Sequence, residues 1–225
     1  MIRFLPPTYI YVALTFDDGT IHQYKLARLL SRQGMRCTLF CITHLERHPD
    51  TGRRLVVTEP EKIHELYSMG HEIASHTCTH PDLRFVAPKR LIKELGASKC
   101  KLETIIGDKV LGFAYPKSQY NANVLERVKK EYYYARCGTD SKDPWNINVH
   151  DRYVISSIGV KKAATLPFRA IYRKNNSTPL IVIMMHDISA ILLFDLIYYF
   201  RTFLKARFVT MTEIAKVISE RTNAC

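Results

Sequence analysis

Strand-like and helix-like segments alternate along this chain of 225 residues, and that order constrains its fold more than any other feature. Continuous β-rich runs at 9–15 and 180–185 indicate strands buried on both faces. The other expected strands are 37–42, 71–74, 110–115 and 134–137, and the expected helices are 23–32, 60–69, 88–106 and 121–132. Repeated alternation of this kind predicts an α/β protein with a parallel sheet.

Two architectures fit this order of elements, a barrel and a doubly wound open sheet. Polar motif residues stand at the carboxyl ends of the expected strands, which is where active sites lie in barrels. The sequence contains no glycine-rich phosphate loop, internal repeat or low-complexity linker. We therefore predict a single domain spanning residues 1–225.

The chemistry-bearing residues follow three of these strands. Asp17 and Asp18 end the first apolar run within TFDDG, and His76 and His80 lie four residues apart within HTCTH. Two histidines and one carboxylate are the ligands of a catalytic metal site with an open fourth position. The remaining carboxylate can act as a base on metal-bound water. His186 follows the late strand and is a candidate acid.

These segments resemble the motifs of the polysaccharide deacetylase family, the NodB-like carbohydrate esterases of family 4. TFDDG, H-T-x-x-H and a late apolar run ending in HD occur in the family's order between residues 15 and 187. The resemblance implies a distorted (β/α)7 TIM-like barrel and favours it over the open sheet. It implies Asp17 as general base, His186 as general acid, and one divalent metal ion held by Asp18, His76 and His80. The expected metal is Zn²⁺, with Co²⁺ or Ni²⁺ as alternatives.

The function implied is hydrolysis of N-acetyl groups on an N-acetylglucosamine-containing glycan or glycan precursor. One departure concerns the family's third motif, whose arginine contacts the base, because Ala114 stands in that place. Lys117 or Arg136 could substitute for that arginine. We expect Tyr115, Pro116 and Lys117, which follow Ala114, to bind substrate or support the site.

The fourth motif of the family matches less closely. Asp143 and Trp145 fall near its place, in a segment that is one residue too long. By the resemblance, Asp143 would orient His186 and Trp145 would form a wall of the acetyl pocket. A loop tryptophan beside a turn proline explains the same residues without function.

Three competing functions stay open at the level of sequence. The first is hydrolysis of another non-peptide C–N bond, in a ureide or a short amide. The second is a glycan-binding protein that has lost catalysis. The third is nucleic-acid binding, which the net charge of +12 would favour, although no recognised nucleic-acid motif supports it.

Partners and location follow from composition and from the ends of the sequence. The first residues contain no long apolar region or cleavage site, so we expect a cytoplasmic protein, with unconventional export as an alternative. No apolar run reaches about 18 residues, which predicts no transmembrane segment. Residues 188–203 predict a buried helix against a sheet, with peripheral membrane contact left open. The expected partner is an N-acetylated glycan, including anionic or lipid-linked forms, and the oligomeric state stays open.

The remaining cysteines and histidines are expected to be structural. Six cysteines without a CxxC pair indicate mostly buried free thiols in a reducing compartment. Cys78 lies between the two motif histidines and should face away from the metal. No functional role is expected for His22, His44, His48, His64, His71 and His150.

Overall fold

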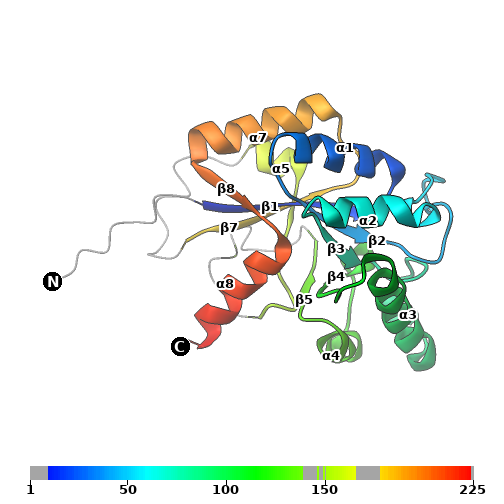
Figure 1. The fold of residues 1–225 in the computed structure, drawn as a ribbon. Helices are drawn as coiled ribbons and strands as arrows, with labels where there is room; N and C mark the ends of the chain where they lie inside the picture. The colour runs from blue at the N-terminus through cyan, green and yellow to red at the C-terminus, as the bar shows by residue number, and fades with distance from the viewer. Residues whose placement is uncertain (1–9, 139–145, 147–148, 150, 166–177, 224–225) are drawn as a thin grey trace.

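The computed structural model describes residues 10–138, 146, 149, 151–165 and 178–223, and these form one curled parallel sheet with helices around it (Figure 1). The strands are β1 (Ile10–Asp18), β2 (Thr38–Cys41), β3 (Glu72–Ser75), β4 (Gly112–Ala114), β5 (Tyr134–Arg136), β6 (Ile158–Gly159), β7 (Leu180–Met185) and β8 (Ala206–Val209). The helices are α1 (Ile21–Arg32), α2 (Pro60–Ser68), α3 (Pro88–Ile106), α4 (Ala122–Glu131), α5 (Val160–Ala164), α7 (Ala190–Leu204) and α8 (Met211–Asn223). Short 3₁₀ turns are η1 (Val56–Thr58), η2 (Leu83–Phe85) and η3 (Pro116–Ser118).

The sheet closes on itself as a distorted (β/α)7 barrel, which confirms the predicted fold. Its strand order is β5-β4-β3-β2-β1-β7-β6, and β8 pairs with the first half of β1. A parallel bridge between Arg136 and Ile155 joins β5 to the segment that leads into β6. The first strand of the chain therefore lies in the middle of the sheet, paired with β2 on one side and β7 on the other.

Side chains of β1 alternate between the two faces of this sheet, as a strand requires. Val12, Leu14 and Phe16 belong to the larger apolar core, which also contains buried residues of α1 and α7. Ala13 belongs to a second core with β7 and α8, inside the barrel. Because Asp17 shares the face of Ala13, the alternation directs it into the barrel.

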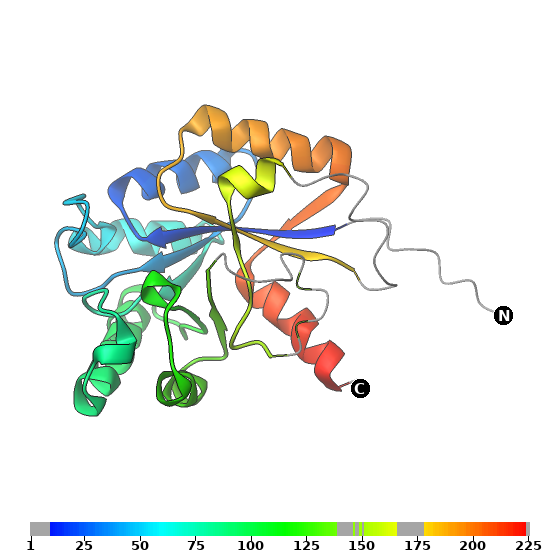
Figure 2. The same cartoon turned by 180° about the vertical axis from the view of Figure 1, so that it is seen from behind.

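Helix α8 covers the amino-terminal end of the barrel. The Met211 N–H donates to Thr38 Oγ1 (3.0 Å), and the Thr212 hydroxyl donates to the Glu72 carboxylate (2.6 Å). Thr38 and Glu72 are the first residues of β2 and β3. Figures 1 and 2 show α8 on the opposite side of β1 from α1, α5 and α7. Because α8 covers the amino-terminal end of the barrel, a functional site is expected at the opposite end, where the strands have their carboxyl ends.

Helix and strand bounds follow the sequence predictions closely in the first 137 residues, and α3 and β7 match them fully. The buried helix expected at 188–203 is α7, which packs one face into the core but leaves its other face open, with Ile191 77% exposed. Three short elements, β6, α5 and β8, were not predicted. Among the described residues, no helix is both long and apolar enough to cross a membrane.

We expect Gly112→Ala to destabilise the fold by about 1–3 kcal/mol, because a methyl group there would overlap the phenol of Tyr134. That phenol cannot move freely, since it donates to the Glu72 carboxylate (2.7 Å). Denaturant unfolding measures the effect. The control is Gly96→Ala in α3, where an added Cβ meets nothing within 4 Å and should stabilise the helix by about 0.5–1 kcal/mol. Equal effects of the two substitutions would contradict the packing at β4–β5.

Candidate functional site

The two adjacent carboxylates diverge because the chain turns sharply where β1 ends. Asp18 and Gly19 both adopt positive φ, 84° and 72°. A Cβ on Gly19 would lie 2.9 Å from Cys41 Sγ, so the turn requires glycine on steric grounds as well. Asp17 consequently stays on the interior face of the strand, while Asp18 leaves the strand direction. Both carboxylates are buried.

A buried glutamine connects the two strand ends that carry the catalytic candidates. The Gln23 amide donates to the backbone carbonyls of Asp17 (2.5 Å) and His186 (2.9 Å). Its side-chain oxygen accepts from the N–H groups of Gly19 and Thr20, both at 3.0 Å. The sequence analysis did not identify Gln23, although Thr20 three residues earlier is the signature of a capping box.

His76 and His80 gather around Asp18, as the sequence predicted. Their Nε2 atoms lie 3.8 Å and 4.0 Å from Asp18 Oδ1, and one ligand atom from each of the three residues lies within 4.8 Å of the others. The His76 Nδ1 lies 2.8 Å from the Ala114 carbonyl, which can only accept, so Nδ1 carries the proton. The Nε2 lone pair of His76 is therefore available to a metal ion.

The electrostatics of this group fit a divalent cation. Burial lowers the pKa of both His76 and His80 to about 3, which leaves the imidazoles neutral. Burial and the neighbouring Asp17 carboxylate raise the pKa of Asp18 to about 7. Asp18 Oδ1 and His80 Nδ1 are buried without a hydrogen-bond partner in the described structure. Neutral imidazoles and an unsatisfied carboxylate oxygen are what a divalent cation would bind.

A third histidine, His48, also lies close to Asp18, although it has no motif context in the sequence. Its Nε2 lies 3.4 Å from Asp18 Oδ1, and the residue is 6% exposed. Its Nδ1 accepts from the backbone N–H groups of Asp50 and Thr51, each at 3.1 Å. The proton of the neutral ring must then be on Nε2. The N–H side of His48 therefore faces Asp18, although it makes no hydrogen bond to Oδ1. One ring nitrogen of His48 also lies within 4.8 Å of candidate ligand atoms of Asp50 and His80.

Arg136 contacts Asp17, as expected of a substitute for the arginine that is missing at Ala114. Its guanidinium donates to Asp17 Oδ2 at 2.5 Å and to Ser157 Oγ at 2.9 Å, and it lies over the Phe40 ring. The side chain is almost fully buried. The other carboxylate oxygen, Asp17 Oδ1, is buried and has no hydrogen-bond partner among the described residues. One oxygen of Asp17 is thus fixed and the other is free to accept a proton.

His186 lies near the Asp17–Arg136 ion pair, toward solvent. Its Nε2 is 3.9 Å from Asp17 Oδ2, and its side chain is 50% exposed. The following Asp187 forms an ion pair with Arg53, so its carboxylate is engaged away from the imidazole. The exposed fraction of His186 is what a group needs if it must reach a bound substrate.

The structure describes three of the other candidate residues, and their expected roles stay predictions. Tyr115 and Pro116 are buried, and the Tyr115 hydroxyl donates to the Tyr153 carbonyl (3.1 Å). Lys117 lies close enough to help lower the pKa of His80. Asp143 and Trp145 lie outside the described residues, so the predictions for them stay predictions.

The cysteines behave as predicted where the structure describes them. Cys37, Cys41 and Cys78 are buried free thiols, whereas Cys100 is exposed. The Cys78 thiol faces α3, with Sγ 3.5 Å from the backbone carbonyls of Lys93 and Glu94. This orientation confirms that Cys78 points away from the histidine group.

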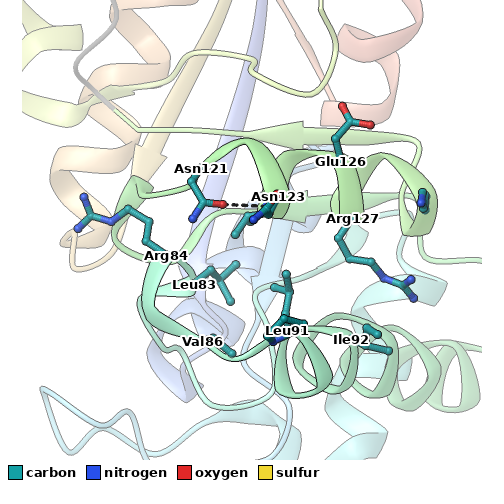
Figure 3. A pocket seen from close by; sticks show the side chains of 12 residues that line it. Leu83, Arg84, Val86, Leu91, Ile92, Asn121, Asn123, Glu126 and Arg127 are labelled. Atoms are coloured by element: carbon teal, nitrogen blue, oxygen red, sulfur yellow. Dashed lines mark hydrogen bonds between the residues drawn. The ribbon is translucent and has the colours of Figure 1, made fainter.

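A separate pocket of about 390 Å³ lies between the start of α3 and helix α4 (Figure 3). Leu83, Val86 and Leu91 contribute apolar walls, and Asn121 and Arg127 lie on its polar side. The residues that line it include neither the metal-ligand candidates nor Asp17 and His186. This pocket is therefore distinct from the histidine group.

Comparison with known proteins agrees with this architecture. A family model described as polysaccharide deacetylase matches residues 6–135. The YxkH protein of Bacillus subtilis (strain 168) is 30% identical over 123 residues, which cover 54% of this chain and 42% of YxkH. The chain thus aligns with less than half of the length of that relative.

Two solved structures share the fold over nearly the whole chain. The peptidoglycan N-acetylglucosamine deacetylase Bc1960 has a TM-score of 0.65 at 20% identity, covering 92% of this chain and 89% of that one. A family 4 acetyl xylan esterase from Clostridium thermocellum, solved with a cobalt ion, has a TM-score of 0.63 at 19% identity, covering 92% and 91%. The family model spans more than half of this sequence, and the chain therefore belongs to the polysaccharide deacetylase family.

Proposed function

We propose that this protein is a metal-dependent deacetylase that removes N-acetyl groups from an N-acetylglucosamine-containing glycan or glycan precursor. The proposal rests on one observation: a set of candidate metal ligands and a candidate proton acceptor lie next to each other at the same end of the barrel. One is the neutral His76–His80 pair around Asp18, and the other is Asp17 with one oxygen held by Arg136. A binding module has no need for both a metal-ligand set and a proton acceptor beside it.

In this proposal, Asp18, His76 and His80 hold one divalent ion, with Zn²⁺ expected first and Co²⁺ or Ni²⁺ as alternatives. The bound ion would activate water and polarise the acetyl carbonyl as a Lewis acid. The acetyl xylan esterase solved with cobalt supports a divalent ion in this fold.

The protein's own groups carry the proton transfers. Asp17 Oδ1 accepts the proton of the attacking water, because Oδ2 is already bonded to Arg136. His186 donates a proton to the departing sugar amine, a role that suits a half-exposed imidazole. Gln23 holds Asp17 and His186 in fixed positions relative to each other, because its amide donates a hydrogen bond to the backbone carbonyl of each residue.

The choice of substrate rests on chemistry shared by the two neighbours. Bc1960 and the xylan esterase are named for removing acetyl groups, one from nitrogen and the other from a xylan ester. Hydrolysis of a ureide or a short amide is the enzymatic alternative, and a lapsed glycan binder is the non-catalytic one.

Acetate release tests the function. Metal-stripped protein should release no acetate from N-acetylglucosamine oligomers, and addition of Zn²⁺ or Co²⁺ should restore release. Acetylated xylan, a ureide and a short amide are parallel substrates. Release from the ureide or short amide alone would replace the proposed reaction. One bound metal with no turnover on any substrate would indicate a protein that binds without catalysis.

We expect Asp17→Asn and Asp18→Asn to fail in different ways. Asp17→Asn should keep the metal and lose about 10²–10⁴-fold in turnover, because the amide cannot accept the proton. Asp18→Asn should lose metal affinity, as should His80→Ala. Turnover and metal content per chain are measured on the same samples. Full turnover of Asp17→Asn would exclude Asp17 as the base.

His48→Ala should weaken Zn²⁺ binding by about 10–100-fold while the stoichiometry stays at one ion per chain, because His48 orients a ligand without being one. Competition with a chelator measures the affinity. His64→Ala, which removes an exposed histidine on α2, is the matched control and should change nothing. Loss of the bound ion in His48→Ala would mean that His48 is itself a ligand.

A further inference from the structure

Helix α7 exposes several large apolar side chains on the side that faces away from the core. Its residues Leu193, Leu196, Ile197, Phe200 and Leu204 form the buried side. The opposite side exposes Ile191 (77%), Tyr198 (65%), Phe203 (52%) and Leu192 (45%). An ordinary surface helix carries mainly polar residues there, whereas α7 adds only Asp195, Arg201 and Thr202 to these apolar side chains.

This exposure is concentrated. Eight large apolar side chains are exposed among the described residues, and four of them lie on α7. They extend from Ile191 to Phe203, which spans about 18 Å along the helix axis. Scattered single exposed residues need no explanation, whereas four on one helix, here called the α7 stripe, mark an interaction surface even with the exposed Asp195 and Thr202 among them.

The charged residues around the α7 stripe indicate which kind of surface the stripe would bind. Helices α1, α5 and α7 lie together on one side of the sheet in both views (Figures 1 and 2). These helices and the residue that caps α7 carry seven exposed cations: Lys25, Arg28, Arg32, Lys161, Lys162, Arg201 and Lys205. The same segments contain a single acidic residue, Asp195. Glu65 of α2 pairs with Arg28, and Asp187 before α7 pairs with Arg53.

We propose that the α7 stripe, with the cations beside it, docks on an anionic lipid surface. Aliphatic and aromatic side chains of this kind enter the boundary between lipid headgroups and acyl chains, while lysines and arginines contact the anionic headgroups. A second copy of the chain fits less well. A two-fold contact through α7 would bring the cations of both copies together with only Asp195 from each to offset them.

The placement of the stripe connects it to the candidate catalytic site. His186 directly follows β7, and Ile191 comes only five residues later, across the cap at Ser189. His22 of α1 holds this connection through a 2.9 Å contact with the Ile188 carbonyl. Docking by α7 would therefore place the start of the helix, close to His186, at the lipid surface.

Sedimentation of the full chain with vesicles tests the proposal. The protein should bind phosphatidylcholine vesicles that contain about one third phosphatidylglycerol far more tightly than phosphatidylcholine alone. Ile191→Ser combined with Tyr198→Ser should weaken binding about tenfold or more. Lys161→Glu combined with Lys162→Glu should weaken it by at least about fivefold for each charge. Phe85→Ser, which alters an 82% exposed phenylalanine on η2, is the control and should bind as the unchanged protein does.

Three results would overturn the proposal: no binding of the unchanged chain to anionic vesicles, equal binding to neutral vesicles, or full binding by the α7 double variant. Analytical ultracentrifugation of the same proteins identifies the competing occupant. A dimer that the α7 double variant dissociates, without vesicle binding, would assign the stripe to a second copy of the chain.

Discussion

Two adjacent carboxylates, buried at the end of the central strand, set the requirements for the rest of this site. A buried carboxylate is costly unless a cation or hydrogen bonds compensate it. The protein meets that need within the chain for Asp17 and leaves it open at Asp18. Asp17 receives the guanidinium of Arg136 from β5, and Asp18 is surrounded by three histidines from two loops. The neutral state of the buried histidines leaves the negative charge of Asp18 for an external cation.

The backbone makes this separation possible. Positive φ at Asp18 and Gly19 turns one carboxylate out of the strand, and positive φ at Thr77 and His80 folds the histidine loop back toward it. Gln23 then joins the ends of β1 and β7 through two carbonyls. The positive φ angles are local backbone strain, which lowers the stability of the fold and must be offset by the surrounding structure. Strain of this kind is typical of functional sites.

The barrel fold and the grouping of Asp17, Asp18, His76 and His80 could be predicted from the sequence, because the motif residues directly follow strand ends. The period of two in β1 directs Asp17 inward, and the spacing of His76 and His80 brings both to Asp18. Arg136 was one of two substitutes considered for the missing arginine, and only the topology, which places β5 near the mouth, distinguishes it from Lys117. His48 could not be found, because it belongs to a loop without motif context and its role depends on hydrogen bonds to Asp50 and Thr51. The exposed face of α7 was missed because an apolar run alone does not show which side is covered.

The ligand set is the central claim, and anomalous X-ray diffraction at the zinc edge from zinc-loaded crystals tests it most directly. The account predicts one strong peak per chain, bonded to Asp18, His76 Nε2 and His80, with His48 at hydrogen-bond distance from Asp18 and not bonded to the metal. A peak between His48, Asp50 and His80 would contradict it, as would zinc bound elsewhere while Asp18 still contacts only histidines.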